Sequence, residues 1–169
     1  TQDGTPRKVT APVSLIVSAF ATLDDVRGTL TPQLDAREAD TTLVLVDLGR
    51  GQRRMAGSIL AQSLEQTGDT VPDLDDPQDL VRLVDAVNAL RSQGLLLAYH
   101  DRSDGGLFAT VCEMAFAGHV GVALNVDMLI TEGDGISDSR AEMGDSKNWA
   151  SQVQARRDEL TLQALFNEE

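Results

Sequence analysis

The strongest constraint on the fold is a short apolar run, Leu95–Tyr99, that stands between two helical patterns. The run is apolar up to its last residue, which is typical of a strand covered on both faces. The helix before it has a natural N-cap at Asp76 and a stop at Gly94. The helix after it carries an apolar stripe and ends at Gly118. This order predicts a strand packed between helices.

Other segments extend this pattern. Short apolar or alternating runs predict three further strands, over Val13–Ala21, Leu43–Val46 and Val120–Val126. Apolar residues at helical spacing predict a helix over Met55–Leu64, and a last apolar segment covers Leu160–Phe166. Because strands and helices do not alternate strictly, we predict an α+β fold with a mixed β-sheet and packed helices.

The composition of the chain limits which kinds of partner and which cell compartment suit it. The 169 residues include 27 acids and 14 bases, a net charge of −13, which argues against binding to nucleic acid or to an anionic membrane surface. The single cysteine, Cys112, excludes an internal disulfide and favours a reducing compartment. No apolar run reaches the roughly 20 residues that cross a bilayer. We therefore expect a cytoplasmic domain.

The two ends and one internal segment predict an incomplete unit. Thr1–Pro6 has turn chemistry with no strand before it, and Leu165–Glu169 stops just after an apolar patch. We interpret residues 1–169 as a single partial domain of a longer protein. Residues 131–148 are polar, with Ile136 and Met143 as the sizeable apolar groups, so we expect a flexible excursion and the least ordered region there.

The loop His100–Gly106 is the strongest candidate for a site, because it joins a predicted strand to a predicted helix. Its carboxylates, Asp101 and Asp104, are hard oxygen ligands of the kind that Mg²⁺ prefers. A chain with a net charge of −13 repels a nucleotide triphosphate unless a cation stands between them. These carboxylates would therefore act through Mg²⁺.

The same loop carries groups suited to phosphate. Ser103 offers a hydroxyl and Arg102 a fixed positive charge. Gly105 and Gly106 remove side chains where a phosphate would approach the free N–H groups of a helix start. The alternative is an ordinary N-cap followed by a glycine turn, which needs no ligand.

Other reactive residues favour structural roles. Cys112 lies on an apolar helix stripe and is interpreted as a packed thiol. His100 and His119 stand at opposite ends of one predicted helix, which argues against a shared metal; His100 either orients a ligand or is a hydrogen-bonded loop histidine. The basic cluster of Arg50, Arg53 and Arg54 either meets a phosphate or forms a solvated turn, and the solvated turn is favoured. The acidic residues Asp73, Asp75 and Asp76 are interpreted as a solvated loop and a helix cap.

The motif HDRSDGGL at His100–Leu107 resembles the large bacterial form of phosphoribosylformylglycinamidine synthase (FGAM synthase). The resemblance covers essentially the whole chain. Its other segments occur in the order typical of that family: Pro12–Ala21, Leu30–Leu34, Val46–Gly49, Ala56–Ser58, Leu60–Gln62, Glu113–Gly118 and Ala164–Glu169.

The resemblance implies a place in a multidomain ligase. The family uses ATP to replace an amide oxygen of formylglycinamide ribonucleotide with nitrogen from glutamine, a step of de novo purine biosynthesis. The chain is similar to the C-terminal subdomain of the second synthetase half, which resembles the C-terminal domain of aminoimidazole ribonucleotide synthetase. Its partners would be the other synthetase segments and the glutaminase domain of the same protein.

The resemblance also implies residue roles. It makes Asp101 a magnesium ligand and Ser103 an ATP contact, beside Gly105 and Gly106, and it assigns no catalytic residue to this chain. Cys112 does not inherit the role of the glutaminase nucleophile. Whether the nucleotide site is catalytic or structural stays open, and we expect the chain alone to be inactive. The alternatives are a related ATP-using synthetase and a non-catalytic acidic interaction domain, in which the loop is only a helix cap.

Overall fold

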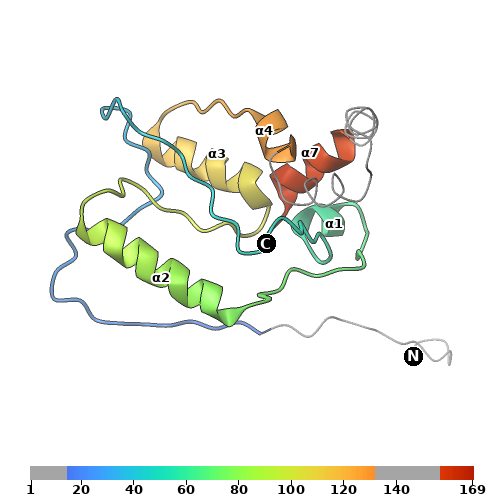
Figure 1. Cartoon of the computed structure of the whole chain (residues 1–169), viewed down its shortest axis with the longest axis horizontal. Helices are drawn as coiled ribbons and strands as arrows, with labels where there is room; N and C mark the ends of the chain where they lie inside the picture. The colour runs from blue at the N-terminus through green and yellow to red at the C-terminus, as the bar shows by residue number, and fades with distance from the viewer. Residues whose placement is uncertain (1–14, 132–156) are drawn as a thin grey trace, which may run out of the picture.

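The structure, a computed structural model, describes residues 15–131 and 157–169 (Figure 1). These two ranges contain helices and no strand. The helices are α1 (Ile59–Ser63), α2 (Pro77–Ser92), α3 (Gly106–Gly118), α4 (Val126–Thr131) and α7 (Arg157–Phe166). Helix α7 packs against both α3 and α4, while α2 contributes no buried residue. The packed part of the molecule is therefore the group formed by α3, α4 and α7.

Helix α2 confirms the predicted helix signals. The side chain of Asp76 accepts a hydrogen bond from the N–H of Gln78 at 3.0 Å, which caps the first turn. Pro77 is the first helical residue, and Asp79 places a negative charge near the positive end of the helix dipole. Beyond the last turn, Gly94 has a φ of +69°, the left-handed conformation that commonly ends helices.

Helices α1 and α3 also lie where helices are predicted, with different lengths. Helix α1 is shorter than the predicted range Met55–Leu64, because the side chain of Ser58 caps it by accepting from the N–H of Ala61 at 3.1 Å. Helix α3 begins after Gly105, whose φ is +85°, and ends before His119, whose φ is +53°. Left-handed residues on both sides thus limit α3.

Helix α4 replaces the end of a predicted strand. Its Val126, Leu129 and Ile130 follow helical spacing and pack toward α7, where Leu160 and Ala164 complete the cluster. Ile130 is 2% exposed, among the most buried side chains of the described residues. The alternating pattern before Val126 predicts a strand, so this short helix was not expected from the sequence.

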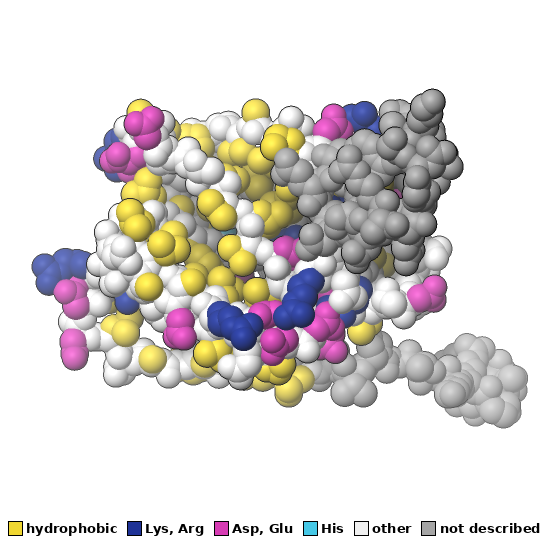
Figure 2. Space-filling model, in the orientation of Figure 1, with side chains coloured by type: hydrophobic (Ala, Val, Ile, Leu, Met, Phe, Trp, Pro, Cys, Tyr) yellow, Lys and Arg dark blue, Asp and Glu magenta, His cyan; other side chains and the backbone are white. Residues whose placement is uncertain are grey.

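The predicted mixed sheet is not observed in the described residues. Residues 15–21, 43–46, 95–99 and 120–125 follow irregular backbone paths. Most of their large apolar side chains are exposed, while Leu96 and Val120 are of intermediate burial. Apolar side chains accordingly appear on the surface of the molecule (Figure 2). The amide of Tyr99 does donate to the carbonyl of Thr31 at 3.0 Å. A strand needs such bonds in series with a neighbouring strand, so these apolar runs alone do not determine strand structure.

Two further predictions fall partly beyond the described ranges. Val13 and Ser14, the start of the first predicted strand, lie outside them. So does the predicted flexible segment 131–148, apart from Thr131 at the end of α4. Within the described part, no helix combines the length and the apolar character that crossing a membrane requires.

The core sits directly behind the candidate loop. On α3, three apolar side chains are buried: Leu107, Val111 and Met114. The rings of Phe108 on α3 and Phe166 on α7 lie 5.5 Å apart between centroids, at an interplanar angle of 43°. The N-terminal end of α3, where the loop begins its turn into the helix, is therefore supported by the C-terminal end of α7.

Candidate functional site

Two consecutive residues of the loop at 100–106 differ sharply in exposure. The side chain of Asp101 is 79% exposed, whereas that of Arg102 is only 12% exposed. Nη2 of Arg102 lies 3.4 Å from Oδ1 of Asp47, so its acidic partner comes from a distant segment. Asp101 is therefore not buried in an ion pair with its neighbour, and its carboxylate is open to a ligand.

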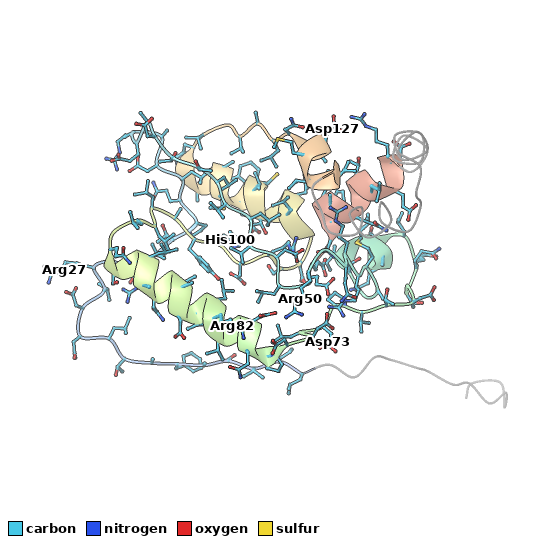
Figure 3. The ribbon with its side chains drawn as sticks, in the orientation of Figure 1. Arg27, Arg50, Asp73, Arg82, His100 and Asp127 are labelled. Carbon is cyan, nitrogen blue, oxygen red and sulfur yellow. The ribbon has the colours of Figure 1, made fainter. Side chains whose placement is uncertain are left out.

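His100 links this loop to α3. His100 is labelled in Figure 3. Its Nε2 lies 2.7 Å from Oε2 of Glu113, and its Nδ1 lies 3.7 Å from Oδ1 of Asp101. The ring is 17% exposed, so it is a hydrogen-bonded loop histidine placed between two carboxylates. His119 follows the other end of α3, as the sequence predicts. Among the described residues, no three or more His, Cys, Asp or Glu side chains are grouped as metal ligands would be.

The glycine pair brings the C-terminal segment against the start of α3. The N–H of Gly105 donates to Oε1 of Glu168 at 2.8 Å, and the same oxygen accepts from the N–H of Ile59 at 2.9 Å. A Cβ on Gly106 would lie 2.5 Å from the carbonyl oxygen of Asn167. The carboxylate of Glu168 therefore accepts a hydrogen bond from the backbone N–H just before α3. Because Gly106 has no side chain, the backbone of the C-terminal segment can lie against it.

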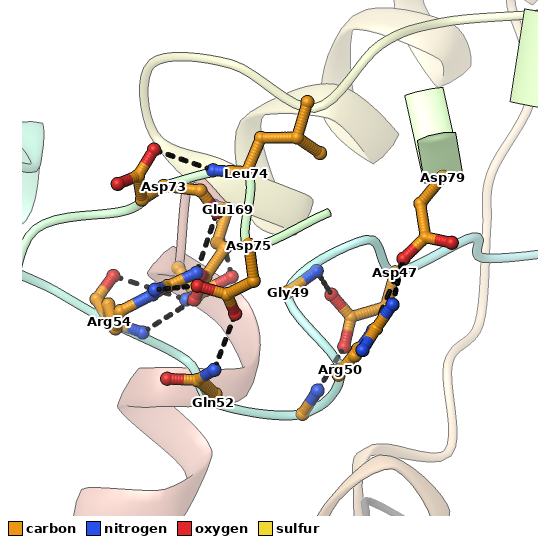
Figure 4. A network of polar contacts seen from close by, with 12 residues as sticks. Asp47, Gly49, Arg50, Gln52, Arg54, Asp73, Leu74, Asp75, Asp79 and Glu169 are labelled. Carbon is orange, nitrogen blue, oxygen red and sulfur yellow. Dashed lines mark hydrogen bonds and ion pairs between the residues drawn. The ribbon is translucent and has the colours of Figure 1, made fainter. Parts of the chain in front are cut away.

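A buried ion pair stands beside this contact (Figure 4). The side chain of Glu169 is 3% exposed and pairs with the guanidinium of Arg54, which is 12% exposed. The backbone N–H of Arg54 also donates to Oε2 of Glu169 at 2.9 Å. The guanidinium further contacts Oδ1 of Asp75 at 3.1 Å and the carbonyl of Asp73 at 2.6 Å.

These contacts correct the interpretation of Arg54 as part of a solvated turn, whereas Asp73 and Asp75 are exposed and Asp76 caps α2, as predicted. Arg54 is held between the acidic loop and the C-terminal segment, and Arg50 pairs with Asp79 at the start of α2. Asn167, which no sequence pattern singled out, is 2% exposed, and its Nδ2 donates to the carbonyl of Arg54 at 3.3 Å. Asn167 and the two acids after it in sequence thus hold the site's framework together.

A pocket of about 400 Å³ lies on the Arg102 side of the loop. Arg53 and Arg102 line it together with Asp47. Burial lowers the pKa of both guanidinium groups below the usual value, and the nearby Asp47 carboxylate acts in the opposite direction. Arg53 is half-buried and not part of a solvated turn. The described pocket therefore combines two partly desolvated cations with one carboxylate.

Cys112 lies on α3 as predicted. Its side chain is partly buried, and Val111 and Met114 beside it on the helix are buried. A thiol in this position packs as a small apolar group.

A comparison with known families gives a match over most of the chain. Residues 40–168, which are 129 of the 169, match the family described as AIR synthase related protein, C-terminal domain. The matched range contains the whole candidate loop, every residue that lines the pocket, and Arg54, whose partner Glu169 is the residue just after it. The chain therefore belongs to the AIR synthase related protein, C-terminal domain family, within the superfamily of ATP-using synthetases.

Proposed function

We propose that this chain is the C-terminal subdomain of the second synthetase half of a large FGAM synthase. As part of that cytoplasmic enzyme it would help to convert formylglycinamide ribonucleotide, ATP and glutamine into the amidine product. The observation that carries the proposal is the exposed Asp101 carboxylate in the loop before α3, within a motif that resembles this enzyme family. Its partners would be the other synthetase segments and the glutaminase domain.

The loop fits a magnesium-bound nucleotide in its chemistry. Mg²⁺ prefers oxygen ligands, and Asp101 and Ser103 present a carboxylate and a hydroxyl at exposed positions. Asp101 would hold the metal and Ser103 would contact ATP. The predicted phosphate role of Gly105 and Gly106 is not retained, because Glu168 accepts from the N–H of Gly105 and the C-terminal segment lies against Gly106. Mg²⁺ would offset the phosphate charge that an acidic chain otherwise repels. Because Mg²⁺ keeps most of its water at a lone carboxylate, the phosphates and further carboxylates would complete the site.

The choice between two related enzymes depends on nitrogen transfer. FGAM synthase takes nitrogen from glutamine, so ADP formation by the full-length enzyme should require both formylglycinamide ribonucleotide and glutamine. We would measure ADP and glutamate release with each component omitted in turn. ADP formation that is unaffected by glutamine would contradict the proposal and favour a related ATP-using synthetase of the superfamily.

The role of Asp101 can be tested by replacing it with asparagine in the full-length enzyme. We expect the affinity for ATP in the presence of Mg²⁺ to fall by about tenfold or more, in the range seen when metal sites lose a supporting group. The fold should be unchanged, because the side chain is exposed and pairs with no arginine that would lose a partner.

Asp85→Asn is the matched control for this measurement, since it removes the same charge from an exposed position on α2. It should leave ATP affinity unchanged. Equal affinities for Asp101→Asn and the unmodified enzyme would remove the metal-ligand role, and the loop would then be a helix cap in an acidic interaction domain.

A further inference from the structure

The pocket beside Arg102 has a charge opposite to that of the chain. Of the residues that line it, two are arginines and one is an acid, which leaves a formal charge of +1 in a chain whose net charge is −13. We propose that this pocket binds the phosphate group of a small phosphate monoester through the guanidinium groups of Arg53 and Arg102. The site is separate from the proposed magnesium position, because neither Asp101 nor Ser103 lines it.

The hydrogen-bonding capacity of Arg102 is only partly used inside the protein. Its contact with Oδ1 of Asp47 is 3.4 Å long, whereas charge-assisted hydrogen bonds are usually about 2.7–2.9 Å. Nε of Arg102 is buried and has no hydrogen-bond partner among the described residues. A buried donor without an acceptor is costly, so the guanidinium of Arg102 has hydrogen-bonding capacity that the described residues leave unsatisfied.

Arg53 approaches the same pocket from another segment. Its Nη2 donates to the carbonyl oxygen of Leu129, a neutral acceptor that does not offset its charge. The charge of Arg53 also lowers the pKa of Arg102, which places the two guanidinium groups within electrostatic range of each other. Two like charges held together in a partly buried pocket are stabilised by an anion between them.

Asp47 offsets only one of the two positive charges in the pocket. Its Oδ1 accepts from the N–H of Gly49 at 2.9 Å, and its Oδ2 accepts from the N–H of Gly51 at 2.8 Å. Both carboxylate oxygens thus serve the turn that leads to Arg53. This leaves Asp47 as a positioning group for the two arginines.

The size and lining of the pocket favour a phosphorylated small molecule over a bare ion. A volume of about 400 Å³ falls within the usual range for small-molecule sites. The planar guanidinium forms paired hydrogen bonds with phosphate oxygens, which a lysine does not. The apolar part of the wall suits the body of such a ligand; it comprises Leu45, Met128, Leu129 and Ala164.

The test is calorimetric titration of the chain with ribose 5-phosphate, and separately with ATP, both in EDTA so that no metal takes part. We expect saturable binding of at least one compound, weakened about tenfold or more in Arg53→Gln and in Arg102→Gln. Arg82→Gln is the control, because Arg82 is a 69%-exposed arginine on α2 outside the pocket. Its affinity should equal that of the unmodified chain.

The two ligands distinguish the source of the phosphate group. Binding of ribose 5-phosphate identifies a sugar-phosphate pocket, and binding of ATP alone identifies a nucleotide pocket. Circular dichroism checks each variant; if either glutamine variant is unfolded, Arg102→Lys replaces it, since it keeps the charge and should still weaken binding by losing the paired geometry. Absence of binding by both compounds, or equal affinities in folded arginine variants and the control, would overturn the proposal. Because EDTA excludes Mg²⁺, this result is independent of the proposed magnesium role of Asp101.

Discussion

Replacing Gly106 with alanine is expected to lower the free energy of unfolding by about 2–4 kcal/mol, the sum of a backbone cost and an overpacking cost. The backbone of Gly106 has a φ of +64°, which a residue with a Cβ adopts only under strain. The added Cβ would also lie 2.5 Å from the carbonyl oxygen of Asn167 and 2.6 Å from the carbonyl carbon of Phe166. These are backbone atoms, so rotation of a side chain cannot relieve the contact.

Gly94→Ala separates the two costs. Gly94 has a similar φ of +69°, but an added Cβ would meet nothing within 4 Å. Its replacement should cost only about 1 kcal/mol, the typical effect at an open left-handed position. Urea unfolding followed by circular dichroism gives both values. Equal losses at the two glycines would mean that the close approach between α3 and the C-terminal segment does not contribute to stability.

Replacing Arg54 with methionine should cost about 3–5 kcal/mol, the usual effect of removing one partner from a buried ion pair. The change leaves the carboxylate of Glu169, which is 3% exposed, without its cation. A second replacement, Glu169→Gln, should recover part of the loss, because a neutral amide still accepts from the backbone N–H of Arg54. Urea unfolding of the two single variants and the double variant measures the coupling.

Arg27→Met is the matched control for an exposed pair. Arg27 pairs with Asp25 at 2.8 Å, yet the two side chains are 90% and 53% exposed, so solvent screens the attraction. Its unfolding midpoint should equal that of the unmodified chain. If Arg27→Met and Arg54→Met lowered the free energy of unfolding by similar amounts, burial of the Arg54–Glu169 pair would add nothing to stability.

The parts of the fold that sequence predicts well are determined by near neighbours. Helix α2 is an example, since its start depends on Asp76 and Pro77 and its stop on Gly94, all within the helix or next to it. A strand instead requires a partner from another segment. The apolar run Leu95–Tyr99 therefore looks the same in sequence whether it pairs in a sheet or follows an irregular path.

The candidate site likewise contains some residues whose roles follow from local sequence and others whose roles depend on distant segments. Local sequence alone predicts Asp101 as a candidate metal ligand, and its side chain is exposed, as contact with a ligand requires. The roles of Arg54 and Arg102 could not be predicted, because their acidic partners lie 115 and 55 residues away in sequence. No local pattern distinguishes such an arginine from one on a solvated turn.

Oε1 of Glu168, which accepts two hydrogen bonds, affects how the candidate loop at residues 100–106 forms. It accepts from amides that lie 63 and 109 residues before it, at the starts of α3 and α1. Closing such long loops is entropically costly and tends to come late in folding. The geometry of the candidate loop is thus completed only when this carboxylate arrives, and one movement of the carboxylate would release both helix starts together. Hydrogen exchange at Gly105 and Ile59 would then report a single opening event shared by two distant segments.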